Sequence, residues 1–434
     1  MLKNRNFLLY SSGRFVSLIG TGIQDIALAL FVLDITGSGA MMGLFLIMSM
    51  VPRLVLIPFA GVVGDSWNRK SIMVWMDYGR GALILGLAFL AVNGMITIPI
   101  LLGAQFLAAI MGSMFGPATS AMLPDLVDEE QFTKANSVMG SINSLSMIIG
   151  PVIGGIIYGI GGIMFALLFN GISFLASGFS EMFIDYHQVT KKLGSVKNVI
   201  KDLKEGFNFI TERRAITIMM VFILILNFLV NPMFHVLLPY VMRIVIGFTS
   251  TQYGFLQSTF LGGLLIGNIT IGVFFSKKKS DKLITRGLIL QMALTTVFVI
   301  MIFPNMILRF GGASMTLFGL FGALFVGMGI FNAYVNTPFM TTMQKLVPTN
   351  FRSRVFSVLE VMSQGIVPIG IGIVGMMLDI IPAHYVGVLI VSPAVVLSVF
   401  FVGKYSKPVF KALNSGISER KKEEISAKKV LETT

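Results

Sequence analysis

Long apolar runs separated by short polar segments fill most of the sequence. A run crosses a hydrocarbon layer about 30 Å thick as an α-helix when it contains about 20 residues. Twelve runs are long enough, near residues 7–33, 41–64, 72–92, 97–122, 136–158, 162–184, 215–242, 253–275, 284–304, 312–340, 354–378 and 384–403. The pattern therefore predicts an all-α integral membrane protein with twelve transmembrane helices.

The longest polar stretch, residues 185–214, divides six predicted spans from six. Apolar residues recur within it at helical spacing, namely Val196, Val199, Ile200, Leu203 and Phe207. This spacing predicts an amphipathic helix lying along a membrane surface. We therefore expect an N-terminal six-helix half over 1–184, a cytoplasmic linker over 185–214, a C-terminal six-helix half over 215–403 and a basic cytoplasmic tail over 404–434.

The two halves share traces of a repeat. A shift of 211 residues aligns Gly43 with Gly254, and a shift of 220 aligns Gly150 with Gly370. Each match is weak in a sequence with 46 glycines, but two nearby offsets agree at corresponding places in each half. Two pseudo-symmetric halves with a binding site between them are a known plan of secondary transporters. The repeat therefore favours a transporter.

The positions of the charges say more than their sum. A formal net charge of +13 would suggest a nucleic-acid partner in a soluble protein. With the N-terminus in the cytoplasm, all Lys and Arg fall on the cytoplasmic side except Arg14, Arg53, Arg80, Arg243 and Arg309. This positive-inside pattern predicts a multi-pass protein of the cell membrane with both termini in the cytoplasm. The expected partners are the lipid bilayer, a small-molecule substrate and protons, and no nucleic-acid partner is expected. We expect the protein to be a monomer.

Several chemistries lack the residues that they need. The sequence has no Cys, and its three His residues, His187, His235 and His384, have no metal-ligand spacing. It also has no phosphate-binding Gly-Lys-Ser/Thr turn, which argues against direct use of ATP. We therefore expect neither metal nor cofactor, and energy from an ion gradient or from the substrate's own gradient. One proton gains about 2.3 kcal/mol per 100 mV.

Seven segments carry a resemblance to a known family. They are LDITGS (33–38), GDSWNRK (64–70), DYGRG (77–81), FGPATSAMLPDLV (115–127), KANS (134–137), GPVIGG (150–155) and DLKEGFNFI (202–210). Together they resemble the major facilitator superfamily, and within it the drug:proton antiporter branch that includes macrolide efflux proteins. The resemblance covers nearly the whole chain. It implies export of small amphipathic or drug-like molecules by alternating access, in exchange for protons.

The segment GDSWNRK falls in the turn between the second and third spans. The resemblance implies that it latches the two halves together at the cytoplasmic side, with Asp65 gripping the start of the eleventh span near Ser353 and Arg354. The expected latch residues are Gly64, Asp65, Arg69 and Lys70, joined by Asp77 and Arg80 at the entrance of the third span. Alternatively, Arg69 and Lys70 serve only as topology signals.

The segment GPVIGG lies in the fifth span and resembles the pattern of antiporters. Three glycines remove side chains so that another helix approaches closely, and a proline bends the axis. The residues concerned are Gly150, Pro151, Gly154 and Gly155. Ordinary helix packing is the alternative interpretation.

Ionisable residues inside a span need a partner or a wet cavity, since each costs about 2.5–3.5 kcal/mol at a helix centre. Asp25 in the first span and Arg53 in the second meet this description. We expect Asp25 to exchange a proton for substrate, with half of a structural ion pair as the alternative. Other acids lie towards span ends where solvent reaches them, so topology or capping is expected for Asp34, Glu181, Glu360 and Asp379.

Amides inside spans are candidates for contact with substrate. The candidates are Gln24, Asn143, Asn227, Asn231, Gln257, Asn332 and Asn336. For any one of them, a hydrogen bond between neighbouring helices is the alternative.

Three rival functions follow from the same residues. The first is the same fold exporting or flipping a lipid, siderophore or metabolite, with uniport as one mode of movement. The second is a membrane enzyme, which would need clustered catalytic groups where this chain has scattered acids, no His pair and no Cys. The third is a receptor that transports nothing, which would have little use for Asp25 and Arg53 inside the membrane.

Overall fold

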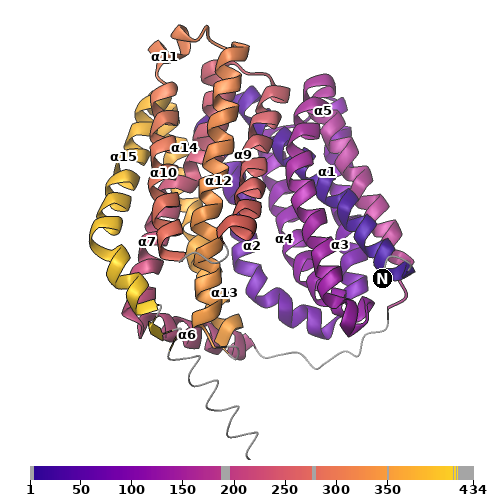
Figure 1. Ribbon diagram of the computed structural model, residues 1–434. Helices are drawn as coiled ribbons and strands as arrows, with labels where there is room; N and C mark the ends of the chain where they lie inside the picture. Colours follow the sequence, from indigo (N-terminus) through magenta and orange to yellow (C-terminus); the bar gives the residue numbers. More distant parts are fainter. Residues whose placement is uncertain are drawn as a thin grey trace, which may run out of the picture.

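The computed structural model describes residues 4–186, 196–275, 280–348, 351–413, 415–416 and 418, and within these ranges all regular secondary structure is helical. The side chains of residues 57–66, 196–199 and 280 are outside this description. Two groups of helices stand side by side, the first six predicted spans in one and the last six in the other (Figure 1). We call them the first bundle and the second bundle.

The first bundle consists of five long helices. They are α1 (Arg5–Thr36), α2 (Gly39–Ser66), α3 (Arg69–Val92), α4 (Ile98–Met122) and α5 (Phe132–Met182), with short 3₁₀ turns η1 (Leu123–Leu126) and η2 (Glu129–Gln131) before α5. Gly162 breaks α5 with φ 62° and ψ −162°, a conformation open to glycine because it lacks a Cβ. The two runs predicted at 136–158 and 162–184 are therefore the two arms of α5.

The second bundle follows α6 (Val196–Thr211). Its first span comprises α7 (Arg214–Pro232), α8 (Leu238–Tyr240) and the π-helical segments η3 (Met233–Leu237) and η4 (Val241–Ile246). The remaining elements are α9 (Ser250–Thr270), η5 (Ile271–Phe275), α10 (Ser280–Met301), α11 (Pro304–Arg309), α12 (Met315–Leu346), α13 (Arg352–Gly365), α14 (Val367–Ile380), α15 (Ala383–Phe400) and η7 (Phe401–Tyr405). Within the described residues, eleven segments are long and apolar enough to span a membrane, and one of them, Glu129–Met182, contains the bent α5. The all-α membrane fold predicted from the apolar runs is confirmed.

Local sequence explains where several helices begin and end. Gly37, at φ 62°, ends α1, and its N–H donates to the Leu33 carbonyl. The Asn68 side chain accepts from the Ser71 N–H at the start of α3. Thr249 and Gln252 form a capping box at the start of α9. These capping residues fix where one helix ends or the next begins, so that the chain can reverse direction between spans.

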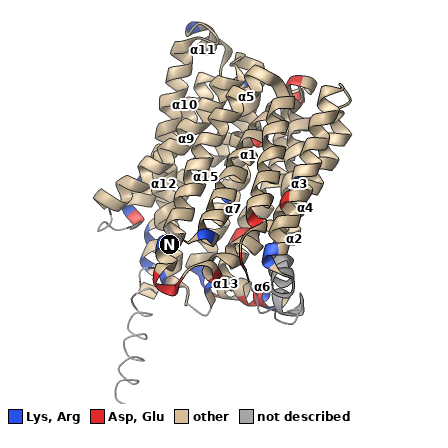
Figure 2. Cartoon of the chain, turned by 90° about the vertical axis from the view of Figure 1, so that its right-hand side faces the viewer, with Lys and Arg blue, Asp and Glu red and all other residues tan. Residues whose placement is uncertain are grey.

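The two ends of the molecule differ. The N-terminus and α6 lie at one end, which we call the α6 end, and α11 lies at the other, the α11 end (Figure 1). Charged residues gather at the α6 end, and the middle of the helices is mostly uncharged (Figure 2). This distribution is typical of a bundle whose middle lies in hydrocarbon.

Helix α6 packs on α13 by a face that the sequence did not indicate. A Cβ on Gly206 would lie 2.5 Å from the Arg354 carbonyl oxygen, so the two helices touch there. Phe209 and Ile210 are buried, whereas Ile200 and Phe207 of the predicted apolar stripe are 60% and 46% exposed. Contact with α13 therefore buries Phe209 and Ile210, and Leu203 of the predicted stripe is partly buried against the same core.

Candidate transport site

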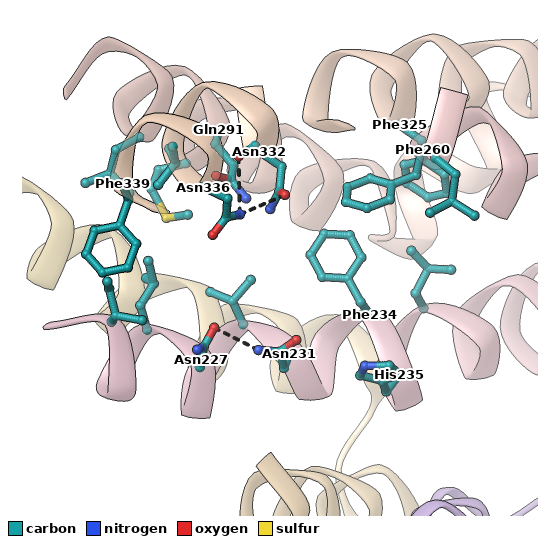
Figure 3. A pocket seen from close by; sticks show the side chains of 18 of the residues that line it. Asn227, Asn231, Phe234, His235, Phe260, Gln291, Phe325, Asn332, Asn336 and Phe339 are labelled. Carbon is teal, nitrogen blue, oxygen red and sulfur yellow. Dashed lines mark hydrogen bonds between the residues drawn. The ribbon is translucent and has the colours of Figure 1, made fainter. Parts of the chain in front are cut away.

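A cavity of about 410 Å³ lies inside the second bundle, between the α7–η3 segment, α9, α10 and α12 (Figure 3). Its volume is within the range of about 300–1,000 Å³ that is usual for small-molecule sites. Five amides predicted from the sequence line it: Asn227, Asn231, Gln257, Asn332 and Asn336. Gln291 and His235 line it as well, and they were missed as substrate candidates.

Two asparagine pairs lie on facing walls of this cavity (Figure 3). On α7, the Asn231 Nδ2 donates to the Asn227 Oδ1 at 2.9 Å. On α12, the Asn336 Nδ2 donates to the Asn332 Oδ1, also at 2.9 Å. Residues four apart are neighbours on one helix face, so the spacing in sequence creates both pairs. The amides thereby hold one another in place while facing the cavity.

Aromatic rings form much of the remaining wall. Phe234 of η3 and Phe260 of α9 have ring centroids 5.1 Å apart, and Phe325 and Phe339 come from α12 (Figure 3). The π-helical segment η3 follows Pro232 directly. Such segments are frequent at functional sites because they shift the side chains that follow out of α-helical register. The cavity is therefore amphipathic, with amides set among apolar rings.

The other four site candidates lie outside this cavity, in the first bundle. Asp25 and Arg53 are exposed side chains, and Arg53 is close enough to act on Asp25 electrostatically, but no ion pair within 4.0 Å joins these two described residues. Gln24 is buried and accepts from the Asn170 Nδ2, so it links α1 to α5. Asn143 is exposed on α5. Gln24 thus makes the helix-to-helix bond that was the alternative to substrate contact.

Polar contacts join the two bundles at the α11 end. The Arg243 guanidinium donates to both Asp34 oxygens at 2.7 and 2.9 Å, and the Tyr158 hydroxyl donates to Asp34 Oδ2 at 2.7 Å. The Asp379 carboxylate of α14 accepts from the Gly39 N–H at 2.6 Å and from the Ser38 hydroxyl at 2.6 Å. A carboxylate at a helix N-terminus satisfies free N–H groups, so Asp379 caps α2 from the other bundle. The capping role expected for Asp379 is confirmed.

The GPVIGG segment supplies close contacts on two sides of α5. A Cβ on Gly150 would lie 3.0 Å from the Cα of Gly22 in α1. A Cβ on Gly155 would lie 2.4 Å from the Ser250 carbonyl oxygen, which is at the start of α9 in the second bundle. Ser258, further along α9, donates to the Ile148 carbonyl oxygen at 2.6 Å. The segment therefore brings α5 against both α1 and α9, as the small side chains predicted.

The expected latch region is described only in part. The side chains of Gly64 and Asp65 are outside the described residues. Arg69 lies 3.0 Å from Asp125, and the Tyr186 hydroxyl donates to the same carboxylate at 2.7 Å. Burial, and then this hydrogen bond, raises the pKa of Tyr186 to about 12.

The start of α13, where Asp65 was expected to bind, contacts the linker helix α6. Arg354 lies 2.8 Å from Asp202 and 2.6 Å from Glu205, both on α6. These ion pairs connect α6 to the second bundle. Lys70 is partly buried at the beginning of α3.

Buried charges collect in the first bundle near the α6 end. Asp77 accepts from Arg80, whose guanidinium lies 4.3 Å from the ring centroids of both Phe115 and Phe174. Glu181 is 0% exposed, so the expectation that solvent reaches it was wrong. The second arm of α5 packs against α1 and α3, and this covers its last turn. The Ser177 hydroxyl donates to Glu181 at 3.3 Å.

The fold and these contacts define a class: a polytopic all-α membrane protein with two helical bundles, polar contacts between them at the α11 end, and a ligand-sized cavity inside the second bundle. A family model described as Major Facilitator Superfamily matches residues 10–371. The chain belongs to the Major Facilitator Superfamily.

Several curated relatives are similar in sequence. The chain is 28% identical over 294 residues to the uncharacterized MFS-type transporter YkuC of Bacillus subtilis, covering 64% of this chain and 66% of the relative. It is 23% identical to macrolide efflux protein A of Streptococcus pyogenes, covering 64% and 69%. It is 29% identical to the putative bacilysin exporter BacE of Bacillus subtilis, covering 50% of each. The alignments thus span about two thirds of the first two relatives and half of the third.

Solved structures share the fold at low sequence identity. A bacterial homologue of the iron transporter ferroportin in an inward-facing state is similar with a TM-score of 0.69 at 16% identity, covering 93% of this chain and all of that one. The nucleoside transporter NupG has a TM-score of 0.73 at 13% identity, covering 92% and 99%. These similarities concern the fold alone.

Proposed function

We propose that this protein is a secondary transporter that exports small amphipathic molecules across the cell membrane in exchange for protons. The observation that carries the proposal is the amide-and-phenylalanine cavity of about 410 Å³ enclosed by four helices of the second bundle. Its mixture of apolar rings and fixed hydrogen-bonding groups suits a molecule with an apolar body and a few polar groups. The efflux protein and the exporter among the relatives support the direction of transport.

Alternating access requires one closed end and one end that opens. Polar side-chain contacts join the bundles at the α11 end, where Asp34 binds Arg243 and Asp379 caps Gly39, and along α5 and α9. The positive-inside rule assigns the α6 end to the cytoplasm. In this proposal, the described state receives cargo from the cytoplasm and releases it after the contacts at the α11 end separate.

Proton exchange is assigned to the first bundle. Asp25 is an exposed carboxylate inside a span, with Arg53 near enough to respond to its charge. Protonation would remove the negative charge of Asp25 and leave the positive charge of Arg53 without a neutralising neighbour. The net charge within the span therefore depends on whether a proton is bound. Coupling then passes between bundles through the α5–α9 and α2–α14 contacts.

The test uses purified protein in liposomes that contain a pH-sensitive dye and maintain an imposed pH gradient. A panel of macrolides, lipophilic cations and labelled lipids is added in turn. We expect one class of cargo to cause proton movement in the wild-type protein and none in Asp25→Asn. Movement of a labelled lipid or metabolite with no proton flux would contradict antiport and favour uniport by the same fold. Full proton dependence in Asp25→Asn would remove Asp25 from the mechanism.

A further inference from the structure

The cavity of the second bundle is built from uncharged side chains. Its 23 lining residues include six amides, one histidine and one tyrosine, and none of them is Asp, Glu, Lys or Arg. The exposed charges of the first bundle, Asp25 and Arg53, are not part of its wall. Cargo bound there meets amide dipoles and aromatic rings in place of a countercharge.

The amides retain hydrogen-bonding groups that protein atoms do not use. The Gln257 Oε1 is buried and accepts no hydrogen bond within the described residues. Within each asparagine pair, one N–H group donates to its neighbour's carbonyl oxygen. Among the described side chains, this leaves the Asn227 and Asn332 amide nitrogens without an acceptor. The wall therefore offers both donors and acceptors to a ligand, from three helices.

Charge and hydrogen bonding have opposite energetic consequences in such a site. An ion transferred from water to this wall loses its hydration and gains no opposite charge, which is a large cost in a low-dielectric interior. For a cation the aromatic rings of the wall offset part of this cost. A neutral amide or hydroxyl group loses its hydrogen bonds to water, but it forms new ones with the free amide groups of the wall. A buried acceptor left without a donor, such as the Gln257 Oε1, is itself costly, so a ligand that donates to it removes that cost.

We propose that the cavity of the second bundle binds cargo in an uncharged form, through an amide- or hydroxyl-type group carried on an apolar body, and that it discriminates against both cations and anions. This inference rests on the proposed function, and it specifies the class of substrate. It also separates the tasks of the two bundles, because cargo binds among amides in the second while the ionisable pair of Asp25 and Arg53 lies in the first.

Three fluorescent probes with one aromatic body test the proposal. They are dansylglycinamide, which is neutral, dansylglycine, which is an anion, and the dansyl derivative of aminoethyl-trimethylammonium, which is a cation. Binding to the full-length protein in nanodiscs is followed by dansyl fluorescence, with empty nanodiscs subtracted. We expect the neutral probe to bind at least tenfold more tightly than either ion. A cation that binds as tightly as the neutral probe, or absence of binding by all three, would overturn the proposal.

Variants then locate the site. Gln257→Leu removes the unpartnered oxygen and should weaken dansylglycinamide binding about fivefold, as expected for one hydrogen bond. Gln257→Glu places a carboxylate in the wall and should reverse the preference in favour of the cation. Asn136→Ala, at an exposed amide near the start of α5 in the first bundle, is the matched control and should leave all three affinities unchanged. An unchanged neutral preference in both Gln257 variants would place the binding elsewhere.

The outcomes are distinguishable from those of the transport assay. Tight cation binding in a protein that moves protons and cargo would refute the neutral-cargo inference and leave the transporter standing. Selective binding of the neutral probe by a protein that moves no cargo in liposomes would refute the proposed function. The wild-type comparison of the three probes does not depend on how any variant folds.

Discussion

At the scale of single residues, the first bundle buries an ion pair near the α6 end, and specific neighbours hold it in place. Asp77 is 0% exposed and accepts from Arg80, which lies between two phenylalanine rings. A buried ion pair contributes little net stability, but removal of one partner leaves the other charge without compensation.

Arg80→Leu should therefore destabilise the protein strongly. The expected loss is about 3–5 kcal/mol of unfolding free energy, as for other broken buried pairs. Asp77→Asn combined with Arg80→Leu should recover more than half of it, because the uncompensated carboxylate is gone. Denaturant unfolding in detergent measures both. The control Arg309→Leu, at an exposed site on α11, should change stability by less than about 0.5 kcal/mol. Equal losses in the single and double variants would show that Arg80 acts through its packing on the rings.

The same scale shows what sequence alone could tell about the site. Amides inside apolar runs were recognisable, and five of the seven candidates line the cavity. Gln291 carries the same signal within the run 284–304 and could have been found in this way. Gln24 and Asn143 could not be separated from the others, because a sequence does not specify which side of a helix meets a cavity and which meets another helix.

At the scale of elements, glycines set the distance between bundles. A Cβ on Gly254 of α9 would lie 2.3 Å from the Pro151 carbonyl oxygen of α5, and nothing lies within 4 Å of a Cβ on Gly262 of the same helix. Backbone atoms cannot move aside as a flexible side chain does, so any side chain at Gly254 must push the helices apart.

Gly254→Ala should weaken the α5–α9 contact and lower the unfolding free energy by about 1–3 kcal/mol, the usual cost of overpacking. Gly262→Ala, on the same helix, is the matched control. It should leave the unfolding free energy unchanged or raise it slightly, since alanine stabilises a helix by about 1 kcal/mol relative to glycine. Thermal unfolding and transport rate in the same preparations compare them. Equal unfolding temperatures and transport rates in the two variants would mean that α5 and α9 can move apart at little cost in free energy.

Helix positions were largely predictable, because about 20 apolar residues are needed to cross hydrocarbon. The break near Gly162 was anticipated, because one predicted run ends at 158 and the next begins at 162. That a single glycine makes it was not, since glycine is common inside membrane helices. The buried face of α6 was also beyond the sequence. Its apolar stripe indicated a membrane surface, but the contact with α13 uses Gly206, whose significance lies in close approach to another backbone.

At the scale of the whole molecule, the two bundles meet where Arg243 binds Asp34 and where Asp379 caps α2. Both contacts join distant parts of the sequence and both lie at the α11 end. The sequence placed these acids at span ends but did not pair them. In the proposed alternating-access cycle these contacts keep this end closed, so their strength should set the balance between the two access states.

Arg243→Gln should shift that balance toward opening at the α11 end. The chain has no cysteine, so Ser250→Cys, at a buried site beside Gly155, provides a single reporter for a membrane-impermeant maleimide. We expect labelling to accelerate roughly tenfold in the variant, which corresponds to about 1.4 kcal/mol lost from the closed state. Arg309→Gln, at the same end, should leave the labelling rate unchanged. No acceleration in Arg243→Gln would show that the closure does not depend on this ion pair.

Export of small amphipathic cargo in exchange for protons can be measured as uptake into inside-out membrane vesicles. Vesicles containing the protein receive dansylglycinamide while their interior is held acidic, and accumulated probe is measured against vesicles that lack the protein. Proton-coupled export predicts accumulation above the external concentration, lost when the pH gradient is collapsed and lost in Asp25→Asn. Accumulation that survives collapse of the gradient, or no accumulation of this or any other amphipathic probe, would contradict it.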